Sequence, residues 1–261
     1  MDKAQQLKET IQDADLVLVG IGEEFNEQFS NIGEYAELVE GLKVIDEQER
    51  LSWMIPFLEK AYLEQQSESQ VLKAYRNLYD IIKDKNYFIV TTCIDGNVRK
   101  AGFDNARIVE PCGGYFNMQC SEKCHTELYN SDGYVTKIRQ GIQNGTLQQL
   151  EQPCCPKCGK PFVFNNIMSG AYVEEGYLPQ WEVYTKWLQR TLNKKLCILE
   201  LGVGMGVPSV IRWPFEKIAF YNKKASFFRI NETLYQLTEE IGDKGVSIEG
   251  NAQEFLLNKL V

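Results

Sequence analysis

The sequence has one histidine, no apolar run that approaches eighteen residues, and fewer basic than acidic residues. The missing apolar run excludes a membrane-spanning helix, which needs about twenty such residues. Because 28 Lys and Arg stand against 36 Asp and Glu, the net charge is −8. An acidic surface argues against non-specific binding to nucleic acid or to an anionic membrane. We therefore expect neither nucleic acid nor a membrane as a partner.

The first six residues are polar and lack the apolar stretch of a secretory signal. Eight cysteines without an export signal indicate a reducing compartment, in which thiols bind metals more often than they form disulfides. The sequence thus predicts a cytoplasmic protein. Its 261 residues are enough for one sizeable core and a smaller module.

Four cysteines in two pairs carry the clearest chemical signal. Cys120 and Cys124 form one pair, and Cys155 and Cys158 form the other, about thirty residues later. Four sulfurs on two tight turns suit a closed, tetrahedral, structural zinc site, although a disulfide or scattered buried thiols are the alternative. Cys154 competes with Cys155 as a ligand, and we favour Cys155 because it gives the Cys-x-x-Cys spacing.

Apolar strands alternate with helical patterns along most of the chain, which indicates an α/β fold with a parallel, doubly wound sheet. We expect helices at 3–13, within 31–83, at 180–192 and at the end of the chain. Buried strands are expected within 14–22 and at 87–92, 107–109, 196–201, 226–230 and 246–248, and shorter strands at 115–119 and 162–164.

In such sheets, ligands bind beyond the carboxyl ends of the strands. Glycines occur at the ends of five of the six predicted strands, and a missing side chain lets backbone approach a ligand closely. This pattern indicates a nucleotide pocket. The segments concerned are Gly20-Ile21-Gly22, Cys93-Ile94-Asp95-Gly96, Glu110-Pro111-Cys112-Gly113-Gly114, Gly202-Val203-Gly204-Met205, Asn231 and Gly250-Asn251-Ala252.

The order of these segments resembles the sirtuin family over nearly the whole chain. Sirtuins have a glycine turn, a Thr-Gln-Asn-Val-Asp-Gly-like segment, an Ile-Glu-x-His-Gly-like segment, a four-cysteine zinc ribbon, and late Gly-Thr-Ser-like, Ile-Asn and Gly-Asp-Ala-like segments. The bacterial branch linked to macrodomains, whose members are protein ADP-ribosyltransferases, is closer still. The segments that resemble this branch are residues 100–104, 119–125, 199–204 and 208–215.

The resemblance implies roles for single residues in binding NAD or ADP-ribose. Gly20 and Gly22 match the first glycine turn, and Gly202 and Gly204 match the ribose–phosphate turn. Asn231 matches the residue that contacts the adenosine ribose. Asn251 and Ala252 match the adenine end, and Asp95 is kept from the family's Asp-Gly.

The reacting half of the pocket departs from the family. Cys93 stands where sirtuins have the Asn beside the nicotinamide ribose, and Cys112 stands where deacylases have a general-base His. A neutral thiol is a poor general base. We therefore expect deacylation to be weak or absent, with Cys93, Cys112 and Asp95 at the catalytic positions. The two thiols either fill space or act together as a reversible disulfide or a nucleophile.

The first loop departs as well, because Glu23 and Glu24 follow the glycine turn, where sirtuins have small residues and a serine. Two carboxylates about 5 Å from a diphosphate would each cost roughly 3 kcal/mol at an effective dielectric constant of 20. Carboxylates that point inward would repel NAD, whereas carboxylates that point to solvent would leave the pocket open. We expect the solvent-facing arrangement, which is common for acidic residues at a helix start.

These observations predict a Rossmann-like sheet of strand order 3-2-1-4-5-6 with a small zinc-ribbon and helical lobe. The larger lobe would comprise 1–24, 66–111 and 166–261, and the small lobe 25–65 and 112–165. Three functions remain open: a divergent sirtuin that binds NAD or ADP-ribose, an active NAD-dependent ADP-ribosyltransferase or deacylase with rebuilt catalytic residues, and an interaction module without a nucleotide. A protein substrate or partner fits each of them.

Overall fold

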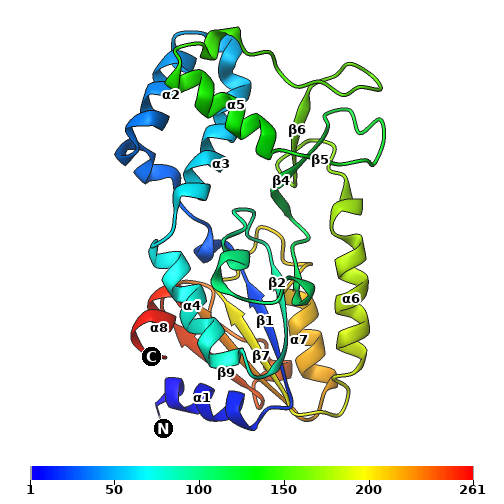
Figure 1. Cartoon of the computed structure of the whole chain (residues 1–261). Helices are drawn as coiled ribbons and strands as arrows, with labels where there is room; N and C mark the ends of the chain where they lie inside the picture. The colour runs from blue at the N-terminus through cyan, green and yellow to red at the C-terminus, as the bar shows by residue number, and fades with distance from the viewer. Residues whose placement is uncertain (1, 261) are drawn as a thin grey trace.

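The computed structural model describes residues 2–260 and places a six-stranded parallel sheet below a smaller part made of helices and a three-stranded antiparallel sheet (Figure 1). The strand order of the larger sheet is β3-β2-β1-β7-β8-β9, which confirms the predicted 3-2-1-4-5-6 order. Its strands are β1 (Leu16–Ile21), β2 (Asn86–Thr91), β3 (Ile108–Val109), β7 (Leu196–Leu201), β8 (Ala225–Asn231) and β9 (Gly245–Glu249).

Helices cover both faces of this sheet, which explains why β1 is apolar at nearly every position. Val17, Val19 and Ile21 share a core with α1, α4 and α8, whereas Leu16 and Leu18 share another with α6 and α7. The first layer is α1 (Lys3–Asp13), α4 (Gln70–Ile82) and α8 (Ala252–Asn258), and the second is α6 (Leu178–Gln189) and α7 (Arg212–Tyr221). Helix α6 packs on this second core through Tyr184, which is buried, and through the partly buried Trp181 and Trp187.

The smaller part has a core of its own, to which residues between Leu38 and Leu63 and between Met118 and Phe164 contribute. Its helices are α2 (Ala36–Asp46), α3 (Ile55–Gln65) and α5 (Asp132–Gln143), and its strands are β4 (Gly113–Cys120), β5 (Tyr129–Asn130) and β6 (Phe162–Asn166), in the order β5-β4-β6. Pro56 lies in the first turn of α3, where its missing N–H costs nothing. The lobe boundaries given above stay a prediction.

Two helices, α5 and α7, and the short strand β5 were not predicted from the sequence. Helix α5 lies inside the segment assigned to the cysteine module, and its buried Val135 and Ile138 are three residues apart, a helical spacing that could have revealed it. Within residues 2–260, no helix has the length and apolar character needed to cross a membrane.

Candidate functional site

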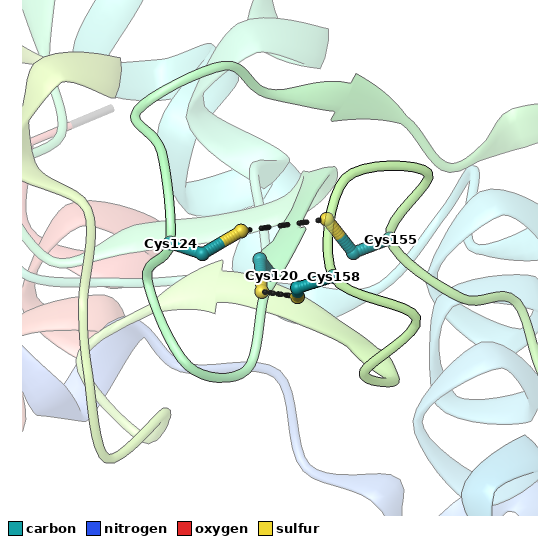
Figure 2. A group of neighbouring side chains, drawn as sticks. All are labelled: Cys120, Cys124, Cys155 and Cys158. Atoms are coloured by element: carbon teal, nitrogen blue, oxygen red, sulfur yellow. Dashed lines mark hydrogen bonds between the residues drawn. The ribbon is translucent and has the colours of Figure 1, made fainter.

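The structure brings the four predicted cysteines together at the end of β4 and in the loop before β6 (Figure 2). All four sulfurs lie within 4.8 Å of one another. The Sγ atoms of Cys120 and Cys158 are 3.4 Å apart, and those of Cys124 and Cys155 are 3.6 Å apart. Cys154 lies outside the cluster, with its exposed thiol donating to the Gln152 carbonyl oxygen.

These distances fit a zinc ion. A tetrahedron with 2.3 Å Zn–S arms has edges of about 3.8 Å, close to both sulfur–sulfur distances. Two turns present the sulfurs, and Gly159 helps to shape the second because its φ of 72° lies in the left-handed region. Four sulfur ligands leave no open position for water, so a metal in this cluster would be structural.

His125, the only histidine, is a partner of this cluster that the sequence analysis did not foresee. Its Nδ1 accepts from the Glu127 backbone N–H at 3.1 Å. In a neutral ring the proton then lies on Nε2, which is 3.2 Å from Cys155 Sγ and donates to it. His125 therefore donates a hydrogen bond to the sulfur of Cys155 without being one of the four cysteines. Hydrogen-bond partners of this kind commonly orient metal ligands. The position of His125 directly after Cys124 in the sequence could have indicated this contact.

Gly20 and Gly22 are explained by packing within the protein. A Cβ at Gly20 would lie 2.4 Å from Ile211 Cγ2, so the glycine lets the start of α7 approach β1. A Cβ at Gly22 would lie 2.4 Å from Val203 Cα, so the turn after β1 contacts the turn after β7 directly. Their assignment to a nucleotide stays a prediction, and close packing accounts for both glycines without one.

The carboxyl ends of β7, β8 and β9 form one rim, which we define by the backbone N–H groups of Gly204, Gly206, Glu232 and Ala252. Asn231 connects the loops after β7 and β8. Its Nδ2 donates to Val203 O at 3.2 Å, and its Oδ1 accepts from the N–H groups of Thr233 and Leu234. Both the nitrogen and the oxygen of its amide therefore make hydrogen bonds within the protein.

Asn251 has a similar structural role at the next strand end. It caps α8, because its Oδ1 accepts from the backbone N–H groups of Gln253 and Glu254 at 3.0 and 3.2 Å. Gly202 sits in the left-handed region with φ of 60°, and a Cβ there would lie 2.5 Å from Glu24 Cβ. These residues predicted to bind the nucleotide therefore lie at neighbouring strand ends, and their binding role stays a prediction.

A buried ion network supports the rim from behind. Glu200 is fully buried, and its Oε1 is 2.6 Å from Arg229 Nε and 3.5 Å from Arg212 Nη1. Arg229 also contacts Glu216 at 2.8 Å and donates to Gln236 O. Arg212 Nη1 donates to Val203 O at 2.6 Å. Because both arginines bond to rim-loop carbonyls, the network holds the loops after β7 and β8.

Glu23 and Glu24 turn their carboxylates onto the rim, so the expectation that they face solvent is wrong. Glu23 Oε2 accepts from Gly204 N–H at 2.6 Å, and its Oε1 accepts from Gly206 N–H at 3.3 Å. Glu24 Oε1 and Oε2 accept from the N–H groups of Glu232 and Ala252, each at 2.8 Å. Burial raises the pKa of Glu24, although these two hydrogen bonds act in the opposite direction.

Cys93 and Cys112 are both free and 1% exposed. Cys93 Sγ donates to Gly22 O at 3.1 Å, so this thiol is engaged with backbone. Burial raises the pKa of the Cys93 thiol well above its ordinary value and that of Cys112 to about 12. Both are neutral near pH 7 and supply neither a general base nor a thiolate. Their catalytic assignment stays a prediction.

Asp95 joins the loops that follow β1 and β2. Its Oδ2 accepts from Glu27 N–H at 2.8 Å, and its Oδ1 accepts from Asn97 N–H at 2.9 Å. Burial raises the pKa of this carboxyl to about 6, although both hydrogen bonds lower it. Its oxygens are occupied by the protein's own donors, which explains its position without a catalytic role.

A cleft of about 680 Å³ lies beside this region, between the helices of the smaller part and β6. Trp53, Phe57 and Phe164 give it an apolar lining, and Ile94 borders it from the loop after β2. Met168, which follows β6, is 79% exposed at its edge.

Two curated proteins resemble the chain in sequence, and no model of a protein family matches it. A protein named "Protein ADP-ribosyltransferase" from Staphylococcus aureus strain Mu50 is 24% identical over 266 residues, covering 94% of this chain and 83% of that protein. A Fusarium oxysporum f. sp. cubense protein, named "Probable bifunctional ADP-ribose hydrolase/ADP-ribosyltransferase", is 30% identical over 138 residues. That match covers half of this chain and 23% of the fungal protein.

Solved structures resemble the chain along its whole length. A Sir2 variant with a p53 peptide and NAD has a TM-score of 0.62 at 13% identity and covers 98% of this chain and 97% of its own. A Sir2 homologue in complex with 2'-O-acetyl ADP ribose has a TM-score of 0.60 at 15% identity and covers all of this chain and 95% of its own. The sheet order, the cysteine cluster and these likenesses together show that the chain has the fold of the Sir2 sirtuins.

Proposed function

We propose that the chain is a zinc-containing, sirtuin-like protein that binds NAD or ADP-ribose at the rim, with deacylation weak or absent. One observation carries this proposal: four backbone N–H groups from three strand ends converge on two neighbouring oxyanions, the carboxylates of Glu23 and Glu24. Backbone N–H groups in this arrangement are the donors that a diphosphate needs. The rim thus has anion-binding chemistry in the place where the fold binds its ligands.

We expect weak or absent deacylation because of the residues in the reacting half of the pocket, Cys93, Cys112 and Asp95. Base catalysis needs a group that accepts a proton near neutral pH within reach of the substrate. Cys93 and Cys112 are buried neutral thiols, Asp95 is held by backbone donors, and the only histidine lies at the cysteine cluster. If the chain turns over NAD, ADP-ribosyl transfer to a protein is the favoured reaction, because the S. aureus relative is named for it. The apolar cleft beside Ile94 would then receive the acceptor.

Zinc would hold the smaller part together, and Cys120, Cys124, Cys155 and Cys158 would be its ligands. A bound zinc ion here supplies folding energy rather than chemistry. We also propose a cytoplasmic location, which the reduced cysteines favour.

Calorimetric titration of the zinc-loaded protein with NAD, ADP-ribose and adenosine tests the proposal. We expect NAD and ADP-ribose to bind at least tenfold more tightly than adenosine, which lacks the diphosphate. The NAD sample is then assayed for free nicotinamide. Binding without nicotinamide would indicate a sensor or scaffold, and release of nicotinamide would show that the protein cleaves NAD. No binding of NAD or ADP-ribose up to millimolar concentration would contradict the proposal.

The second candidate is an interaction module that binds no nucleotide. It is favoured by the same two carboxylates, because they already hold the N–H groups of the rim and would repel a second anion. The calorimetric experiment separates the two candidates, since only the first predicts heat on addition of ADP-ribose.

A further inference from the structure

The carboxylates of Glu23 and Glu24 together hold all four donors of the rim. Glu23 spans the turn after β7, with hydrogen bonds of 2.6 and 3.3 Å, and Glu24 joins the ends of β8 and β9, with two of 2.8 Å. An N–H group that donates to a carboxylate has no second proton to offer. A ligand oxyanion can therefore enter the rim only when a carboxylate leaves it.

The backbone that carries the two side chains is fixed. Phe25 is fully buried, with its ring centroid 5.1 Å from that of Tyr75. Gly22 N–H donates to Leu201 O at 2.9 Å, and Glu24 N–H donates to Gly202 O at 3.2 Å. Gln253 Nε2 donates to Glu24 O. Only the side chains can leave the rim, and Glu23 is the freer of the two because it is exposed whereas Glu24 is half-buried.

We infer that Glu23 and Glu24 form a built-in carboxylate plug that competes with a diphosphate for the N–H groups of the rim. The inference rests on the proposed function for the identity of the natural ligand. The competition between the two carboxylates and an external oxyanion does not depend on which nucleoside the ligand carries. The plug lowers the affinity of the rim for a diphosphate, because the ligand must displace two carboxylates that are already in place.

The experiment uses inorganic pyrophosphate as the probe, because it presents a diphosphate without a nucleoside. Its dissociation constant is measured by calorimetry for the full-length, zinc-loaded wild type and for Glu23→Ala/Glu24→Ala. We expect the double variant to bind at least a hundredfold more tightly. Glu23→Gln/Glu24→Gln keeps the size of the side chains and removes only their charge, and we expect it to bind at least tenfold more tightly. It also serves as the test if the alanine variant fails to fold.

Glu239→Ala/Glu240→Ala is the matched control. It removes two exposed carboxylates that lie outside the rim, so the change in net charge equals that of the test variants. We expect less than a threefold change. An equal gain in this control would mean that net charge alone governs binding and would overturn the plug, as would unchanged affinity in both double variants. Pyrophosphate binding by the variants without nucleotide binding by the wild type would uphold the plug and reject only the proposed function.

Discussion

The cysteine cluster and the rim both gather groups from distant segments around one point, but they differ in what the chain provides there. At the cluster, the sulfurs of four cysteines face one another (Figure 2). At the rim, N–H donors meet carboxylate acceptors from the same chain. The cluster therefore needs an external cation, whereas the rim is already satisfied without a ligand.

Convergence of groups from distant segments therefore does not by itself identify a binding site. Four thiolates in close contact repel one another unless a metal compensates them, so their geometry has few explanations other than a metal. Backbone N–H groups are neutral donors, and an internal carboxylate satisfies them as well as a ligand does. Experiments that remove one partner from each region separate the two cases.

Removal of the metal should have the largest effect. Structural zinc contributes on the order of 10 kcal/mol of apparent free energy at neutral pH, so a strong chelator should unfold the smaller part. Cys155→Ser should do the same, whereas Cys154→Ser, a change at the adjacent exposed thiol, should leave zinc content and melting unchanged. Elemental analysis and thermal melting provide the readouts. No zinc in the purified protein, together with a melt that the chelator does not alter, would refute the metal site.

Breaking the ion network behind the rim should come next. Arg229→Met leaves Glu200 fully buried with only Arg212 beside it, at 3.5 Å. Removing one partner of a buried pair costs about 3–5 kcal/mol, and urea unfolding measures it. Lys186→Met, which breaks the exposed pair with Glu182, should cause no measurable change. Similar midpoints for the two variants would show that the network does not hold the rim.

Asp95 should give the chain a distinctive pH dependence. Because burial raises its pKa to about 6 from 3.8, the folded protein binds a proton that the unfolded chain does not bind between those values. This contribution to stability is complete below pH 4 and is lost as the pH rises through 6, on the order of 3 kcal/mol in all. Asp95→Asn cannot titrate, so its stability relative to the wild type should rise by that amount from pH 4 to pH 7.

Urea unfolding at four pH values measures this difference, and Asp84→Asn, at an exposed position, controls for the loss of one negative charge. A constant difference between Asp95→Asn and the wild type across this range would show that Asp95 ionises in the folded protein as it does in the unfolded chain.

The smallest expected effect lies at His125. His125→Ala removes the N–H donor to Cys155 Sγ and should weaken zinc binding about tenfold, because partners of metal ligands typically contribute 10–100-fold. A competition titration with a chromophoric chelator measures the change. His125→Gln, which retains an N–H donor, should recover part of it. Equal zinc affinity in all three proteins would assign the contact a packing role only.

The sequence predicted the cluster and the sheet order because both depend on local patterns. The Cys-x-x-Cys spacing places two sulfurs on one turn, and alternating strands and helices restrict the order of a parallel sheet to a few possibilities. The position of Cys154 outside the cluster also agrees with the preference for Cys155.

The direction of Glu23 and Glu24 was not predictable in this way. The N–H groups that hold Glu23 are 181 and 183 residues away in sequence, and those that hold Glu24 are 208 and 228 residues away. Acidic residues at a helix start face water by default, and here tertiary contacts override that default. The engagement of Asn231 with Val203, and of His125 with Cys155, depends on contacts of the same long-range kind.

The central claim is that the rim is an anion-binding site held by the chain's own carboxylates. Amide chemical shifts in ¹⁵N-labelled protein test it most directly. The resonances of Gly204, Glu232 and Ala252 should move when Glu23 and Glu24 are replaced by alanine, and should move again when ADP-ribose is added to that variant. Shifts of these three amides in neither step would show that the carboxylates do not hold the rim and that no nucleotide binds there.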